Sequence, residues 1–150
     1  MAKEFIHNIP RYCFWLLNVN PAEILNCPIL LKRIDAVKQH RLKSPADETK
    51  AFAETPMLFC QLAQPRKKFI AFPKVSSENR KYIPIDYLSP DIIVGDKLYV
   101  IENAQLYHFG ILTSNVHNAW MRTVAGRLES RYSYSNTIVY NNFPWPICTE

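Results

Sequence analysis

Apolar residues recur along this chain in short runs that proline and polar residues interrupt, so the pattern predicts many short elements. Residues 28–42 carry apolar side chains at roughly helical spacing and predict a helix. The basic side chains of that helix could follow a phosphate backbone or simply face solvent. Asn20, which precedes a proline, indicates the start of a shorter helix. A third helical stretch is predicted over 104–126, with a break near Ser114 and its end at Gly126.

Other apolar runs predict strands. The aromatic run at 11–17 predicts a buried strand, and 82–88 predicts another. Residues 67–75 also predict a strand, placed at a sheet edge or bulge because Pro73 has no N–H to donate. Two apolar runs flank residues 95–96, a Gly-Asp pair that is typical of a β-hairpin.

Helices and strands follow one another without the regular alternation of a parallel α/β protein. Residues 44–55 add a polar loop and a short helix, for which Ser44 is the predicted cap. We therefore predict an α+β fold, a single mixed domain with a small twisted β-sheet flanked by helices. The 150 residues suffice for one hydrophobic core, and the sequence shows no repeat or domain boundary.

The net charge of +5 favours a polyanionic partner without requiring one. No cysteine or histidine spacing matches a zinc site, and none of the motifs GxGxxG, Walker A, HExxH or GxSxG is present, so we predict no metal site and no catalytic residue in this chain. No apolar run approaches the ~18 residues of a membrane span, and the N-terminus lacks a secretory signal, so we predict a cytoplasmic protein with no membrane partner. The cysteines are interpreted as free thiols, with disulfides as the alternative: Cys13, Cys27, Cys60 and Cys148.

Residues 126–146 concentrate the planar, amide and guanidinium side chains that read base edges and hold phosphates. Glu129 and Arg131 are separated by one residue, so in an extended segment they project from one face, with Tyr132 and Tyr134 on the other. Such a pair could match a C·G base pair, with Arg131 donating to guanine O6 and N7 and Glu129 accepting from cytosine N4. The alternative is an ion pair on a solvated strand.

Several motifs occur in an order that resembles a known family. They are SSENRKYIP at 76–84, FGILTS at 109–114, GRL at 126–128 and IVYNNFPWP at 138–146. Together with shorter matches near the N-terminus, they resemble the target recognition domain of MmeI-type (type IIL) restriction–modification enzymes and their methyltransferase-only relatives. The resemblance covers nearly the whole chain and implies that residues 1–150 are an excised recognition domain of a larger enzyme.

In that family the first and third residues after Gly-Arg-Leu help to choose one base pair, and these positions are Glu129 and Arg131 here. The resemblance thus implies a double-stranded DNA recognition module of a type II restriction–modification system, without catalysis of its own. Its partner would be the methyltransferase domain of the parent chain, which would use S-adenosylmethionine to methylate adenine at N6. Other residues are predicted either to contact the DNA backbone or to make structural bonds: Ser76, Ser77, Arg80, Arg122, Arg127 and Asn141.

One residue departs from the family, and one motif excludes a catalytic methyltransferase domain. Asn118 stands where members of the family commonly have an apolar residue. Residues 142–145 read Asn-Phe-Pro-Trp, which lacks the two consecutive prolines of the catalytic tetrapeptide in amino-methylating DNA methyltransferases. The alternative function is a protein–protein docking module in which the aromatic run at 143–146 packs on a partner domain.

Overall fold

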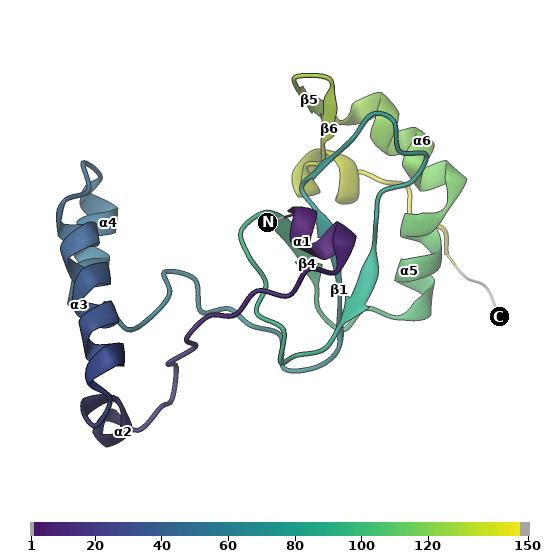
Figure 1. Cartoon of the computed structure of the whole chain (residues 1–150). Coiled ribbons are helices and arrows are strands. Elements are labelled where there is room, and N and C mark those ends of the chain that lie inside the picture. Colours follow the sequence, from purple (N-terminus) through teal and green to yellow (C-terminus); the bar gives the residue numbers. More distant parts are fainter. Residues whose placement is uncertain (1, 148–150) are drawn as a thin grey trace. The chain divides into compact units, whose positions relative to one another are not determined.

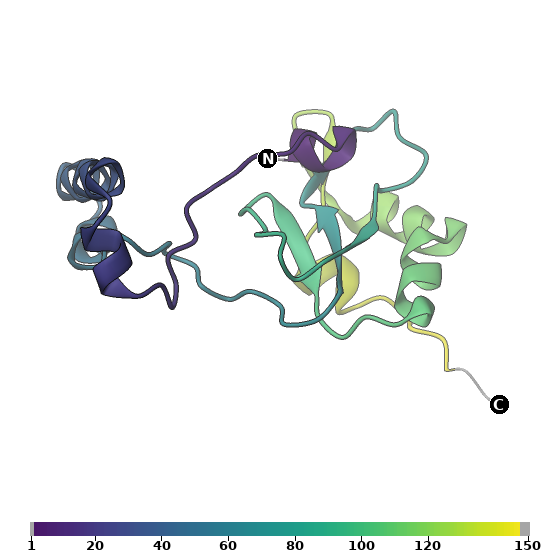
Figure 2. The same cartoon turned by 60° about the horizontal axis from the view of Figure 1, so that its bottom comes forward.

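The computed structural model describes residues 2–147 and contains two compact units (Figures 1 and 2). Residues 12–63 form a helical unit, and the segments 1–11 and 64–150 together form an α+β unit. The predicted α+β class is confirmed, although the sequence pattern did not reveal the division into two units. The helical unit contains α2 (Pro21–Leu25), α3 (Pro28–Leu42), α4 (Asp47–Ala51) and the short 3₁₀ helix η1 (Phe52–Glu54).

The helical unit confirms the helices that the sequence predicted. Asn20 caps α2, since its Oδ1 accepts a hydrogen bond from the Ala22 backbone N–H at 3.0 Å, and α3 begins and ends where the apolar pattern does. The strand predicted at 11–17 is wrong. Residues 11–16 have no regular structure and Tyr12 is 94% exposed. An aromatic run forms a β-strand only where a neighbouring strand pairs with it. Here Trp15 stacks on Phe59 instead, with ring centroids 5.4 Å apart.

A single arginine fastens η1 and the segment after it to α3. The guanidinium group of Arg41 donates to three backbone carbonyl groups, those of Phe52 at 2.7 Å, Thr55 at 3.0 Å and Leu58 at 2.8 Å. The forked, planar guanidinium can reach several acceptors at once, which a lysine cannot do in a fixed geometry. The contact matters because α3 has no buried residue with which to hold this segment by apolar packing.

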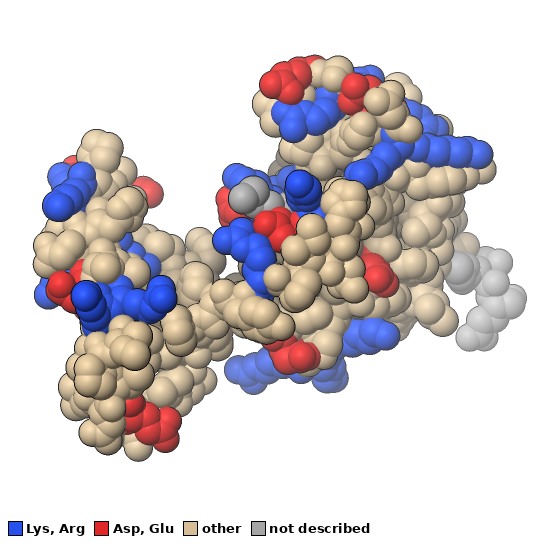
Figure 3. All heavy atoms as spheres, viewed as in Figure 1, with Lys and Arg blue, Asp and Glu red and all other residues tan. Residues whose placement is uncertain are grey.

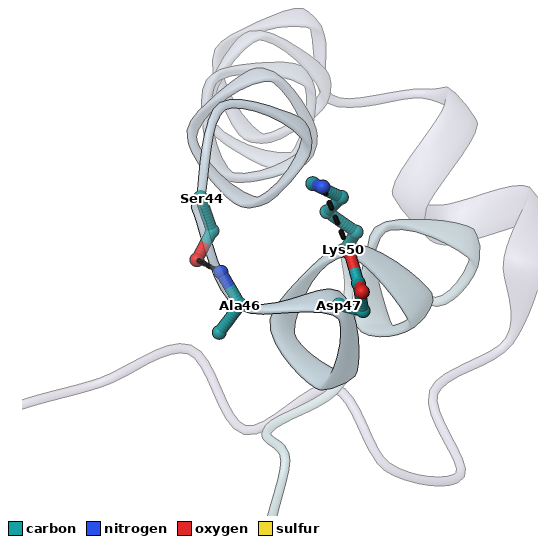
Figure 4. A network of polar contacts seen from close by, with 4 residues as sticks. All are labelled: Ser44, Ala46, Asp47 and Lys50. Atoms are coloured by element: carbon teal, nitrogen blue, oxygen red, sulfur yellow. Dashed lines mark hydrogen bonds and ion pairs between the residues drawn. The ribbon is translucent and has the colours of Figure 1, made fainter.

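The cap predicted for α4 lies elsewhere. Ser44 Oγ accepts from the backbone N–H of Ala46 at 3.2 Å, so it closes the turn that leads into the helix (Figure 4). Ala46 occupies the N-cap position and has no side-chain oxygen to offer. Within the helix, Lys50 Nζ and Asp47 Oδ1 form an exposed ion pair at 2.9 Å.

The α+β unit contains two antiparallel three-stranded sheets where the sequence predicted one small sheet. The first has the strand order β3-β1-β4 and the second β2-β6-β5. The unit begins with helix α1 (Ala2–His7). Its strands are β1 (Phe69–Pro73), β2 (Val75–Ser76), β3 (Asp86–Leu88), β4 (Leu98–Ile101), β5 (Gly126–Leu128) and β6 (Arg131–Ser133), and its other helices are α5 (Leu106–Thr113), α6 (Asn115–Val124) and the π-helix η2 (Asn136–Tyr140).

Two details of the first sheet differ from the prediction. Strand β1 is central and buried, so it is not an edge strand as a whole, although Pro73 itself lies where β1 has a single neighbour. The sheet tolerates Pro73 because β3 pairs only as far as Ala71, which leaves β1 a single neighbour, β4, beside the proline. The hairpin predicted around 95–96 was wrong. Residues 91–94 form no strand, and β4 pairs with β1 after a turn in which Leu98 N–H donates to Gly95 O at 3.2 Å.

Helices α5 and α6 meet at the predicted break. Ser114 ends α5 and caps α6, because its Oγ accepts from the backbone N–H of His117 at 3.1 Å. Helix α6 ends at Val124, and Gly126 already belongs to β5, two residues beyond the helix. The principal core of this unit lies between the first sheet, α6 and the C-terminal segment, and its buried members are Ile70, Phe72, Ile83, Met121, Tyr132, Tyr134 and Val139.

Asn118 stands where an apolar residue is common in the family, and its hydrogen bonds explain why this position is polar here. It is fully buried, its Oδ1 accepts from the Ile83 backbone N–H at 2.9 Å, and its Nδ2 donates to the carbonyls of Leu112 at 3.1 Å and Ser114 at 2.8 Å. The amide therefore satisfies the end of α5 and fastens the segment at Ile83 to α6.

His117, next to Asn118, is also fully buried. Its Nε2 lies 3.0 Å from the Tyr134 hydroxyl, and its ring packs edge-to-face on Phe143 with centroids 4.6 Å apart. Burial lowers the pKa of His117 to about 4 and raises that of Tyr134. This is a core histidine in the neutral form.

We expect Asn118→Leu to lower the free energy of unfolding by about 2–4 kcal/mol, because it leaves the buried Ile83 N–H without a partner and removes two further bonds. Chemical denaturation measures the change. Asn115→Ala is the matched control, since it removes one exposed hydrogen bond to Tyr82 from the same helix and should cost less than about 1 kcal/mol. Equal losses in the two variants would contradict the role given to Asn118.

Stability should also fall in mild acid. The unfolded chain protonates His117 near pH 6.5, whereas the folded chain resists protonation until about pH 4. The folded state is therefore fully favoured above pH 6.5 and loses about 1–3 kcal/mol as the pH falls from 6.5 to 4. Denaturation midpoints across this range measure the loss, and a His117→Gln variant should show a flatter profile. An unchanged profile in that variant would assign the acid sensitivity to other groups.

Candidate nucleic-acid interface

The hairpin between β5 and β6 carries the two residues that the sequence singled out. Leu128 pairs with Arg131, so Glu129 and Ser130 form a two-residue connection between the strands. Glu129 has φ of 58°, whereas Ser130 is not among the residues with positive φ. A two-residue hairpin with positive φ at the first position usually has glycine there. The condition of an extended segment, on which the sequence argument rested, does not hold for Glu129, because this residue lies in the turn.

The two side chains nevertheless meet. Arg131 Nη2 lies 2.6 Å from Glu129 Oε2, and the side chains are 44% and 76% exposed. Tyr132 and Tyr134 are buried on the other side, as expected from the alternation of side chains along a strand. The turn and the strand together hold a carboxylate and a guanidinium beside each other at the surface. An exposed pair of this kind contributes only about 0.2–1 kcal/mol, so little opposes its exchange for another partner.

Ser130 is held from two sides, which fixes the end of the hairpin. Its carbonyl oxygen accepts from Arg127 Nη1 at 2.9 Å, and its Oγ donates to Glu78 Oε1 at 2.8 Å. The Arg127 guanidinium lies over the Tyr132 ring, 3.8 Å from its centroid. The surroundings thus retain a turn whose backbone conformation is unfavourable for Glu129.

The polar turn after β2 lies against this hairpin. Ser76 is buried and pairs with Tyr132 of β6. Ser77 shapes the turn, since its Oγ accepts from Asn79 N–H and its carbonyl accepts from Arg80 N–H, each at 3.2 Å. These bonds favour the structural alternative for both serines. Arg80 is half-buried, and no described contact engages its guanidinium group.

The remaining predicted residues occupy different places. Arg122 on α6 donates from Nη1 to the carbonyl of Lys81 at 2.9 Å, which fastens the helix to the end of the polar turn. Asn141 is exposed at the C-terminal end of η2, which packs against α6. The structure therefore gathers the polar turn, Arg122 and the hairpin into one region. No described bond joins Asn141 to that region.

Sequence reasoning did not assign a role to Glu78 or Ser130. The two residues are 52 positions apart in the chain, and only the pairing of β2 with β6 brings them together. Glu78 lies inside the motif at 76–84, so its position was visible, but its partner was not.

Charges of both signs surround the end of the hairpin. Glu78 and Glu129 provide two carboxylates, and Arg127 and Arg131 provide two guanidinium groups. Figure 3 shows acidic and basic atoms next to each other over this end of the unit, and more basic atoms beside it. Mixed charge suits a surface that discriminates between partners better than one that only attracts a polyanion.

The potential metal ligands of the described residues do not cluster. Among residues 2–147 no group of three or more His, Cys, Asp or Glu side chains could hold a metal ion. None of the three glycines has a positive φ, and they are scattered, so they do not form the glycine-rich loop that S-adenosylmethionine would need. Cys13, Cys27 and Cys60 are free and exposed, and Cys148 lies outside the described residues. No helix in the described part is long and apolar enough to cross a membrane.

The aromatic run at 143–146 is largely occupied by its own chain. Phe143 is buried against His117 and Trp120, and Trp145 Nε1 donates to the carbonyl of Tyr140 at 3.2 Å. The Tyr107 hydroxyl donates to the carbonyl of Pro146. A docking surface made of these rings is thus already covered for the most part.

Comparisons with known proteins agree with the sequence motifs. The family described as the target recognition domain of MmeI matches residues 1–147. DNA methyltransferase A of Bacillus subtilis (strain 168) is 41% identical over 143 residues, which cover 95% of this chain and 16% of that protein. The structure of the type IIL restriction–modification enzyme MmeI in complex with DNA superposes with a TM-score of 0.96 at 45% identity, over 99% of this chain and 20% of that one. This chain belongs to the family of MmeI target recognition domains.

Proposed function

We propose that this chain recognises a specific sequence in double-stranded DNA for a DNA methyltransferase, with the β5–β6 hairpin as its base-reading element. Family membership supports DNA recognition, as does the solved complex of a similar enzyme with DNA. The observation that carries the assignment to the hairpin is the exposed Glu129–Arg131 pair on a turn whose conformation the surroundings enforce. Strained positions of this kind are concentrated at functional sites.

The chemistry of the pair selects the base pair. Arg131 would donate to O6 and N7 of guanine, and Glu129 would accept from N4 of cytosine, which together describe C·G in the major groove. A hairpin is narrow enough to enter this groove. Before binding, the carboxylate and guanidinium satisfy each other, so neither group is left unpaired while no DNA is present.

The basic groups beside the hairpin would contact phosphates and fix the position of the duplex. Arg80 is the best placed because no described bond engages its guanidinium group. Arg122 and Arg127 already donate to carbonyl oxygens, and each has further N–H groups to offer. Asn141 would reach the backbone from a separate position on η2. These contacts would set the register and would not choose the sequence.

The rest of the enzyme would supply the reaction. This chain spans 16% of the curated relative and 20% of the solved MmeI chain. We infer a parent protein of type II restriction–modification whose methyltransferase domain binds S-adenosylmethionine and modifies adenine at N6. The recognition domain would present the duplex to it, with the target base flipped out of the stack.

We expect exchange of the reading pair, Glu129→Lys with Arg131→Asp, to replace C·G by G·C at one position of the recognised sequence. Lysine at 129 can donate to guanine and aspartate at 131 can accept from cytosine, so the donor and the acceptor exchange positions on the hairpin. Selection from a random duplex library by the full-length enzyme measures the change, which should amount to about 10- to 100-fold in preference. The control exchanges the exposed pair Asp47 and Lys50 in the helical unit and should leave the selected sequence unaltered. Unaltered selection by both variants would remove the hairpin pair from base reading.

Glu129→Gly should separate stability from recognition. Glycine suits a positive φ, so the free energy of unfolding should stay constant or rise by up to about 1 kcal/mol. The same variant should lose its preference for C·G at the position read by the pair, because the carboxylate is gone. Denaturation of the chain and library selection by the full-length enzyme give the two readings. A variant that folds as well and selects as before would show that this carboxylate reads nothing.

A further inference from the structure

The carboxylate of Glu78 lies against the hairpin from a part of the chain that is distant in sequence. Ser130 Oγ donates to Glu78 Oε1 at 2.8 Å, which joins the polar turn after β2 to the end of the β5–β6 hairpin. Both residues are exposed, so this bond lies at the surface that the hairpin would present to DNA.

The charged neighbours of Glu78 are the arginines of the hairpin. A hydrogen bond from its own backbone N–H, the bond from Ser130 and the positive charges of Arg127 and Arg131 together lower the pKa of Glu78. The group is therefore ionised at neutral pH, and both guanidinium groups are near enough to interact with it. Glu78 is a second carboxylate beside the reading pair, and it is not one of the two predicted to touch bases.

A carboxylate in this place acts differently on phosphates and on bases. DNA phosphates attract arginine in any sequence, and this attraction dominates non-specific binding. A fixed negative charge next to the arginines weakens that attraction and repels the phosphates themselves. A matched base pair offers hydrogen-bond partners to both Arg131 and Glu129. Binding to it is therefore favoured when Glu78 holds the end of the hairpin in place. Specificity rises when the competing mode of binding is disfavoured.

We propose that Glu78 is a specificity-determining positioning residue of the hairpin. It holds the end of the hairpin through Ser130, and its charge opposes docking of the base-reading Arg131 on a phosphate. The proposal rests on the proposed function, since it assumes that the hairpin faces DNA.

Two substitutions separate the bond from the charge. Glu78→Gln removes the negative charge and keeps a side-chain oxygen that can accept from Ser130. Ser130→Ala removes the bond and keeps the charge of Glu78. Glu48→Gln changes the net charge of the chain by the same amount as Glu78→Gln, but at an exposed position of the helical unit, and serves as the matched control.

Binding of the full-length enzyme is measured at several salt concentrations, to the duplex obtained by selection and to one altered at the base pair that the hairpin reads. Glu78→Gln should tighten binding to the altered duplex about two- to fivefold and the matched duplex less. It should also steepen the salt dependence by up to about 0.9 in log Kd against log salt, which corresponds to release of Arg131 to one phosphate. Ser130→Ala should weaken the matched duplex and leave the altered one nearly as before.

Equal effects of Glu78→Gln and Glu48→Gln on the altered duplex and on the salt slope would overturn the proposal. An unchanged matched affinity in Ser130→Ala would remove the positioning role. Failure of the proposed function looks different. The wild-type enzyme would then bind the two duplexes equally tightly, whatever residue stands at position 78.

Discussion

Strand β6 connects the hydrophobic core to the surface that we propose reads DNA, and its alternation of side chains is the constraint on which the site depends. Tyr132 and Tyr134 point into the core, where Tyr134 packs on Phe72 and meets His117. Arg131 must then point outward, because successive side chains of a strand face opposite sides. Strand β6 is also the middle strand of its sheet, so the polar turn after β2 and the strand β5 are both positioned by it.

Much of this could be predicted from local patterns. Helix α3, the cap at Asn20 and the break at Ser114 follow from periodicity and capping chemistry that act within a few residues. The outward face of Arg131 followed from a period of two. The spacing of Glu129 and Arg131 singled out the pair, and the family, which followed from motifs in a fixed order, indicated the same two residues.

What could not be predicted depends on contacts between distant segments. The aromatic run at 11–17 reads as a strand, but a strand forms only where a second one pairs with it. Pro73 suggested an edge, and only the short length of β3 shows why a central strand can end in proline. A carboxylate at positive φ in the hairpin turn has no sequence signature, since glycine, asparagine and aspartate are the residues that signal such turns. The bond between Glu78 and Ser130 joins two turns that are 52 positions apart, so it could not be predicted from local patterns either.

The three carbonyl bonds of Arg41 have a consequence for how order is distributed within the helical unit. The buried apolar side chains of this unit that belong to the core are Ile24 and Ala53, and α3 contributes none of its own. The residues after η1 therefore owe their place to directional bonds from one side chain more than to an apolar interior. Apolar packing depends little on direction, whereas a hydrogen bond weakens steeply when its angle departs from the preferred range. Loss of the Arg41 side chain would therefore leave three backbone carbonyl groups between residues 52 and 58 without this donor at once.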